Sequence, residues 1–144
     1  MKKTIIILVS VLLLLTVITY LYINNLKNLE TIAQKHNSEY EKYYEQEITG
    51  TTLISLINKA IDYNEKNNIE KQENGTYTNN DENSIHIYIN FLESEKTINM
   101  ESIAEKQTEN FVKYFAMSTF KCTKIEYHNK TNYIKNIYFE QTNK

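Results

Sequence analysis

TIIILVSVLLLLTVITYLYI, residues 4–23, is an unbroken run of twenty uncharged and mostly apolar residues directly after Met1-Lys2-Lys3. At 1.5 Å per residue, a helix of this length spans about 30 Å, which is the thickness of the hydrocarbon core of a bilayer. Twelve of the fourteen residues from Ile5 to Ile18 are Ile, Leu or Val. At roughly 0.3 to 0.6 kcal/mol each, they favour insertion by about 4 to 7 kcal/mol. The run therefore predicts one transmembrane helix.

A secretory signal peptide is the alternative explanation of this run. Such a peptide ends in small residues of the Ala-x-Ala kind, whereas this run ends in Tyr20-Leu21-Tyr22-Ile23-Asn24 and the first Ala is Ala33. No Cys lies near the run, so lipoprotein processing is not expected. Tyr20 and Tyr22 suit the aromatic belt of a membrane–water interface. We expect an uncleaved anchor, with cleavage to a small secreted protein as the alternative.

The lysines before the span predict its orientation. Lys2, Lys3 and the amino terminus form a stub at residues 1–3, which the positive-inside rule places in the cytoplasm, with the C-terminal part outside. Asn, Lys, Ile and Tyr dominate the chain, all sixteen basic residues are Lys, and there is no Pro or Trp. AT-rich codons encode this residue set, so we infer a bacterium of low GC content. The predicted location is the bacterial cell membrane, with a single pass.

The charge of the exported part argues against a nucleic-acid partner. Outside the span, fourteen Lys stand against eighteen Asp and Glu, a net charge near −4. Bidentate contacts to phosphate and guanine favour Arg, which the chain lacks, and a negative domain repels polyanions. The single Cys122 cannot form an internal disulfide and is predicted to be a small buried hydrophobic residue.

After the span, residues 24–47 are predicted to continue the helix as a stalk, because they contain no Gly or Pro. An apolar stripe recurs on this segment at 3-4-3-4-3 spacing: Leu26, Leu29, Ala33, His36, Tyr40 and Tyr43. The stripe is shorter than the three to four heptads of a confident coiled coil. It either packs on the protein's own domain or associates with a partner helix or a second copy.

Residues 48–144 are predicted to form one α+β domain of two helices on a largely antiparallel four-stranded sheet. The expected helices are Leu53–Asn64 and Glu101–Phe115, and the expected strands are Ser84–Leu92, Thr97–Met100, Thr119–Tyr127 and Tyr133–Gln141. Gly50 is expected to permit an unusual backbone conformation, and the threonines beside it to cap the first helix. Ser102 and Glu105 have capping-box spacing.

Three further local predictions follow from the pattern. Asn74-Gly75 is a turn signal that favours a small hairpin between residues near Ile69 and residues near Tyr77. A change in the phase of apolar residues predicts a bulge near Thr123. The strict alternation after Ser84 predicts that His86 faces solvent.

The sequence contains no catalytic pattern. Cys122 would need a histidine base within hydrogen-bond reach, but His128 lies six residues along the same strand, about 20 Å away. Three scattered histidines and one Cys offer no zinc spacing. The two glycines, Gly50 and Gly75, are isolated and form no phosphate-binding loop. We predict a protein that is not an enzyme and has no cofactor and no metal site.

Tyrosine is the remaining signal, with twelve in 144 residues. Tyr supplies contact area at low entropic cost and is enriched in interfaces, although AT-rich codon usage also raises its frequency. Tyr40 and Tyr43 on the stalk stripe, with Tyr88 and Tyr138 on the outward faces of their strands, are the predicted interaction surface. We expect a binding or assembly module of the cell envelope, whose partner is another envelope protein or a second copy.

A short basic start, an apolar helix that runs into an amphipathic one, and an antiparallel sheet with helices resemble the plan of type IV pilin-like proteins. The likeness is architectural and covers the whole chain loosely. It implies a structural subunit that assembles through the first helix. The cleavage motif of that family is missing, because Met1 to Ile23 contains no Gly, Phe or Glu, so processing by a prepilin peptidase is not expected.

Overall fold

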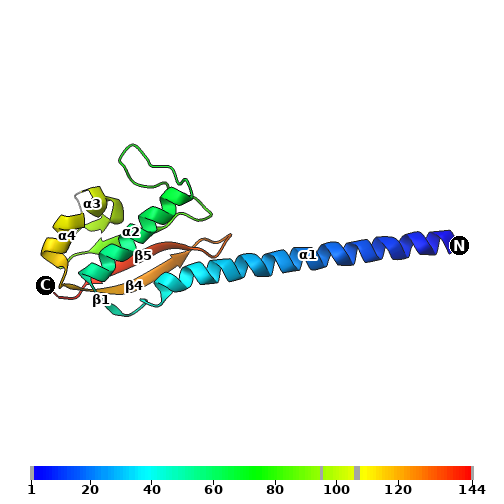
Figure 1. Cartoon of the computed structure of the whole chain (residues 1–144), viewed down its shortest axis with the longest axis horizontal. Helices are drawn as coiled ribbons and strands as arrows, with labels where there is room; N and C mark the ends of the chain where they lie inside the picture. The colour runs from blue at the N-terminus through cyan, green and yellow to red at the C-terminus, as the bar shows by residue number, and fades with distance from the viewer. Residues whose placement is uncertain (1, 95, 106–107, 144) are drawn as a thin grey trace.

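The computed structural model describes residues 2–94, 96–105 and 108–143. Its elements, in chain order, are α1 Lys2–Glu41, β1 Glu47–Thr49, α2 Gly50–Lys66, β2 His86–Asn90, β3 Thr97–Asn99, α3 Met100–Glu105, α4 Thr108–Phe115, β4 Thr119–Tyr127 and β5 Ile134–Gln141. The α+β class is confirmed. Figure 1 shows α1 projecting from a small domain in which α2, α3 and α4 lie on one side of the sheet.

The predicted long apolar helix is confirmed, because α1 is continuous from the apolar run at residues 4–23 into residues 24–41. Among the described helices, only α1 has the length and composition to cross a membrane, and its apolar part is not buried in the protein. A spanning anchor and a signal helix share these properties. The helix ends at Glu41 rather than Glu47. The chain then turns at Glu45, whose φ of 58° is left-handed and whose amide donates to the Cys122 carbonyl at 2.9 Å.

The sheet has five strands in the order β1-β4-β5-β2-β3, so the prediction of four strands was wrong. The additional strand, β1, is three residues long and pairs antiparallel with the start of β4. The expected antiparallel character holds for every pair except β2 and β5, which are parallel. Alternation of apolar residues reports which face of a strand is buried but not which strand lies beside it.

One helix was predicted at Glu101–Phe115, whereas the described residues form two, α3 and α4. Residues 106 and 107 between them lie outside the described residues. The capping prediction for α3 was also wrong by one turn. Asn99 is the cap, because its Oδ1 accepts hydrogen bonds from the backbone amide and the hydroxyl of Ser102, at 3.0 and 2.5 Å. Ser102 is therefore the residue that is capped.

The start of α2 shows the predicted threonine cap, in which Thr49 Oγ1 accepts from the Thr52 amide at 3.3 Å. Gly50 has a different role from the expected one. A Cβ at this position would overlap the carbonyl of Phe115 at the end of α4, and the Gly50 amide donates to the Ser118 carbonyl at 2.9 Å. Gly50 is thus required for a close approach of two backbone segments.

One face of the sheet and the apolar side of α2 form the core. Its fully buried members include Leu53, Ile57, Ile85, Ile87, Ile89, Phe120, Ile137 and Phe139. The predicted bulge is confirmed as a register shift between Cys122 and Lys124. The predicted hairpin is confirmed by a bridge between Lys71 and Tyr77, and its Gly75 has a φ of 81°.

The stalk stripe divides into two parts. Ala33 and Tyr40 are 1% and 2% exposed and pack on the domain, whereas Leu26 and Leu29 are 48% and 60% exposed. Asn37 joins the buried part, and its Nδ2 donates to the Asn132 carbonyl at 2.7 Å. The outer half of the stripe therefore packs on the protein's own domain, and the half nearer the apolar run stays uncovered.

Candidate interaction surface

The second face of the sheet, opposite the core, carries polar and aromatic side chains in three rows across β4, β5 and β2. Strand register gives the rows as Glu126–Asn136–His86, Lys124–Tyr138–Tyr88 and Lys121–Glu140–Asn90. Alternation places these residues on one face, because Ile87 and Ile89 on β2 and Ile137 and Phe139 on β5 point into the core. We call these nine residues the polar face. It contains no aliphatic side chain and has equal numbers of Lys and Glu.

Two tyrosines form the centre of the polar face. The rings of Tyr88 and Tyr138 stack with their centroids 5.2 Å apart and their planes 19° apart. The ammonium group of Lys124 lies 5.4 Å from the centroid of the Tyr138 ring. Both tyrosines are half-buried, and burial is the main cause that raises their pKa. A raised pKa keeps both hydroxyls neutral at physiological pH.

Glu126 connects the central row to the row beside it. Its carboxylate accepts from Asn136 Nδ2 at 2.6 Å and from the Tyr138 hydroxyl at 3.3 Å, and it pairs with Lys124 at 2.5 Å. The hydrogen bond from Asn136 is the largest of the causes that lower the pKa of Glu126. These contacts hold the side chains of Tyr138 and Lys124 in defined positions.

The structure brings together only two of the four tyrosines predicted to form a surface. Tyr88 and Tyr138 are adjacent on the polar face, as described above. Tyr40 is 2% exposed and belongs to the core, so its assignment to an interaction surface was wrong: the stalk stripe turns toward α2 at this point. Tyr43 is half-buried and lines a shallow groove between α1 and α2, with the Lys42 ammonium 4.8 Å from its ring centroid.

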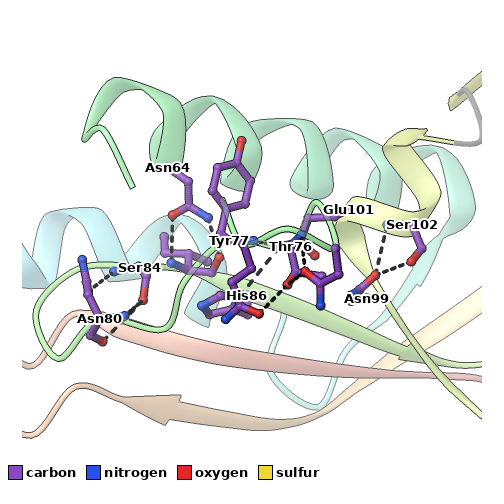
Figure 2. Close-up of polar contacts among 12 residues, drawn as sticks. Asn64, Thr76, Tyr77, Asn80, Ser84, His86, Asn99, Glu101 and Ser102 are labelled. Carbon is purple, nitrogen blue, oxygen red and sulfur yellow. Dashed lines mark hydrogen bonds and ion pairs between the residues drawn. The ribbon is translucent and has the colours of Figure 1, made fainter. Parts of the chain in front are cut away.

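His86 also departs from prediction. It points to the polar face as the alternation requires, but it is only 5% exposed. Figure 2 shows it beside Thr76, Tyr77 and Glu101, and its Nδ1 lies 3.9 Å from Glu101 Oε1. Burial, with smaller contributions from His128 and Lys135, lowers the pKa of His86 to about 4. A hairpin and a helix start that are distant in sequence cover this end of the strand.

Cys122, the candidate nucleophile, lies away from His86, the histidine of the same sheet. Cys122 points into the core, on the face opposite His86, and burial raises the pKa of its thiol to about 11. Such a thiol stays protonated and is a poor nucleophile at neutral pH. Within the described part of the chain, no three residues of the types His, Cys, Asp and Glu are grouped so that they could hold a metal.

An apolar groove at the end of the domain was not predicted. It has a volume of about 490 Å³ and lies between the β2–β3 turn and α4, lined by Phe91, Ile98, Tyr114 and Phe115. Tyr114 lines the groove and is 69% exposed. The available signal was that Tyr114 lies outside the core-facing stripe of a short helix. Figure 1 shows α4 at the end of the molecule opposite the amino terminus.

Comparison with known proteins gives no match to this chain among protein-family models, curated proteins or solved structures.

Proposed function

We propose that this protein is a membrane-anchored, non-catalytic module that binds another protein of the bacterial cell envelope through its polar face. The proposed topology places residues 1–3 in the cytoplasm, residues 4–23 in the cell membrane and the domain outside. One observation carries the proposal: a sheet face with no aliphatic side chain has a preorganised stack of Tyr88 and Tyr138 at its centre. Tyrosine is enriched where proteins meet.

The charges of the polar face indicate what kind of partner it fits. Lys121 and Lys124 stand beside Glu126 and Glu140, so the face is neutral overall and has both signs. A polyanion such as a nucleic acid would meet two carboxylates here. A protein surface with mixed polar groups matches better, because its own charges can be complementary at each position.

Site-specific photo-crosslinking in cells tests this proposal. A photoreactive phenylalanine analogue replaces Tyr88 or Tyr138 in one set of variants and Tyr114 or Tyr127 in the control set, since these two are exposed tyrosines outside the polar face. We expect one hetero-adduct from positions 88 and 138 and none of that mass from the controls. The same adduct from all four positions, or none from positions 88 and 138, contradicts the proposal.

A pilin-like structural subunit is the second candidate. It is supported by the unbroken course of α1 into the domain and by Leu26 and Leu29, which remain exposed on that helix. Photo-crosslinking from position 29 distinguishes it, because a filament gives a ladder of self-adducts. The third candidate, a small secreted protein, predicts a product that lacks the apolar run, which N-terminal sequencing of the exported protein detects.

A further inference from the structure

Three buried polar atoms at one corner of the polar face have no hydrogen-bond partner: His86 Nε2, His128 Nδ1 and Asn136 Oδ1. Their residues are 5%, 2% and 8% exposed. His86 and Asn136 are direct partners in the register of β2 and β5. His128 Nε2 lies 2.8 Å from the carbonyl of Ser84, two residues before His86. All three side chains therefore belong to one corner, where the two parallel strands begin.

The hydrogen-bond partners of these side chains show that all three unpartnered atoms are acceptors. The Ser84 carbonyl can only accept, so His128 Nε2 carries the hydrogen and Nδ1 has the lone pair. Asn136 Nδ2 donates to Glu126 Oε2 at 2.6 Å, which identifies Oδ1 as the free oxygen. The Glu101 carboxylate near His86 Nδ1 favours a hydrogen on that nitrogen and leaves the lone pair on Nε2.

Buried acceptors without a donor call for an explanation, and a bound cation is one that would serve all three. Two imidazole nitrogens and an amide oxygen are ligands for Zn²⁺, Ni²⁺ or Cu²⁺. Histidines that bind a metal usually donate their second N–H to a carbonyl or carboxylate, as His128 does to Ser84. We propose that this corner binds a divalent transition-metal ion through His86 Nε2, His128 Nδ1 and Asn136 Oδ1, with water completing the coordination.

Burial suits the two histidines to this role. It is the largest cause that lowers the pKa of both His86 and His128, and a lowered pKa favours the neutral imidazole that a metal ion binds. The proposal goes beyond the spacing of Cys and His in the sequence, which indicated no metal site. Asn136 is not part of that pattern, and the strand register alone brings it beside His86.

Lys135 opposes the binding of a cation. Its positive charge contributes to the lowered pKa of both imidazoles. It also lines, with His128 and Asp81, a pocket of about 140 Å³ at the turn between β4 and β5. His128 is the one proposed ligand that lines this pocket. If this corner binds a metal ion, removal of the Lys135 ammonium group should tighten the binding of that ion.

Metal titration of the full chain in detergent, purified without a histidine tag and stripped with EDTA, tests the site. Zn²⁺ should raise the melting temperature by at least about 3 °C at saturation. Electron spin echo spectroscopy of the Cu²⁺ form should detect two imidazole nitrogens. Lys135→Met should lower the Zn²⁺ concentration needed for half the shift by about tenfold, a change that a merely structural role of the corner would not produce.

The three histidines provide matched variants. His86→Gln and His128→Gln should each remove one imidazole signal from the Cu²⁺ spectrum and abolish the Zn²⁺ shift, whereas His36→Gln on α1 should change neither. Circular dichroism establishes that each variant is folded, and Asn136→Leu keeps the test open if a histidine variant unfolds. No shift with 1 mM of any of the three ions, a shift that persists in His86→Gln, or weaker binding by Lys135→Met overturns the proposal.

Discussion

Asn37 on α1 and Ile134 at the start of β5 are 97 residues apart and are joined by a hydrogen bond, in which the Ile134 amide donates to Asn37 Oδ1 at 3.0 Å. Asn37 Nδ2 donates to the Asn132 carbonyl, two residues before Ile134 in the chain. One buried side chain thus attaches the stalk to the sheet. Asn64 on α2 does the same at the start of β2, where it both accepts from and donates to the backbone of Ile85.

Asn37→Ala should destabilise the domain by about 2 to 4 kcal/mol, because a buried amide and a carbonyl lose their partner. Urea unfolding of the full chain in detergent measures the change. Hydrogen exchange adds a local readout, since the Ile134 amide should exchange much faster in the variant. Asn28→Ala, an exposed position on the same helix, is the control and should be neutral. Equal effects from both variants would show that Asn37 does not hold the stalk.

Gly50→Ala should cost about 3 kcal/mol, because the new methyl group would overlap the Phe115 carbonyl and α2 and α4 must separate. Thermal unfolding of the full chain measures it. Gly75 provides the comparison: it has open space around it, and only its φ of 81° disfavours a side chain. Gly75→Ala should therefore cost about 1 kcal/mol, and Gly75→Asn less. A milder effect at Gly50 than at Gly75 is incompatible with this account.

Tyr40→Phe should leave stability unchanged or increase it by up to about 1 kcal/mol. The Tyr40 hydroxyl is buried without a partner, and burial raises its pKa above the usual value, so its removal relieves a desolvation cost. Tyr77→Phe is the matched variant with the opposite expectation. It removes the hydrogen bond of 3.2 Å to Glu65 and should cost about 1 kcal/mol. Urea midpoints in detergent compare the two, and a clear loss in Tyr40→Phe argues for an undetected partner.

Stability should fall as the pH drops from 6.5 toward 4 in buffers with EDTA. The unfolded chain binds a proton at His86 near pH 6.5, but the folded chain does so only near pH 4. The unfolded state therefore binds more protons throughout this window, and the folded state loses up to about 3 kcal/mol. Urea midpoints at pH 7, 6, 5 and 4 measure the slope, and His86→Gln should reduce it.

The carboxylates provide a check on this assignment. Hydrogen bonds lower the pKa of Glu126 in the folded state, so its contribution is present above the usual carboxyl pKa and is lost only below about 4.5. Glu126→Gln should therefore leave the slope between pH 6.5 and 5 intact. A slope in that range that survives His86→Gln and His128→Gln together would exclude these two histidines as its source and point to His36, whose pKa burial also lowers.

Much of the fold was accessible from local patterns. The run of twenty uncharged, mostly apolar residues predicted the long helix, because a helix satisfies the backbone hydrogen bonds of a segment that crosses a bilayer. The one-sided pattern from Leu53 predicted α2, which the structure places at Gly50–Lys66. The alternation from Ile85 predicted β2. In each case the signal lies within one segment, because burial on one face repeats with the period of the element itself.

The site was accessible only in part. Tyr88 and Tyr138 were both predicted to face outward, but alternation carries no information that their strands are neighbours, let alone parallel with the rings stacked. Tyr40 was misassigned, since the stripe on the stalk cannot report whether it meets α2 or another protein. The exposure of His86 was wrongly predicted. Tyr77 in the hairpin and Glu101 at the start of α3 cover it, and the pattern of strand β2 carries no information about where these segments lie.

The sequence by itself determined most of the helical and extended segments, which face of each is apolar, and that the N-terminal segment is a helix fit for a bilayer. These depend on contacts between residues a few positions apart. Only the tertiary structure decided that Gly50 meets Phe115, that Asn37 holds Ile134, and that His86, His128 and Asn136 share a corner with three unpartnered acceptors. Such groupings depend on strand order and register, which arise when the whole core is buried at once.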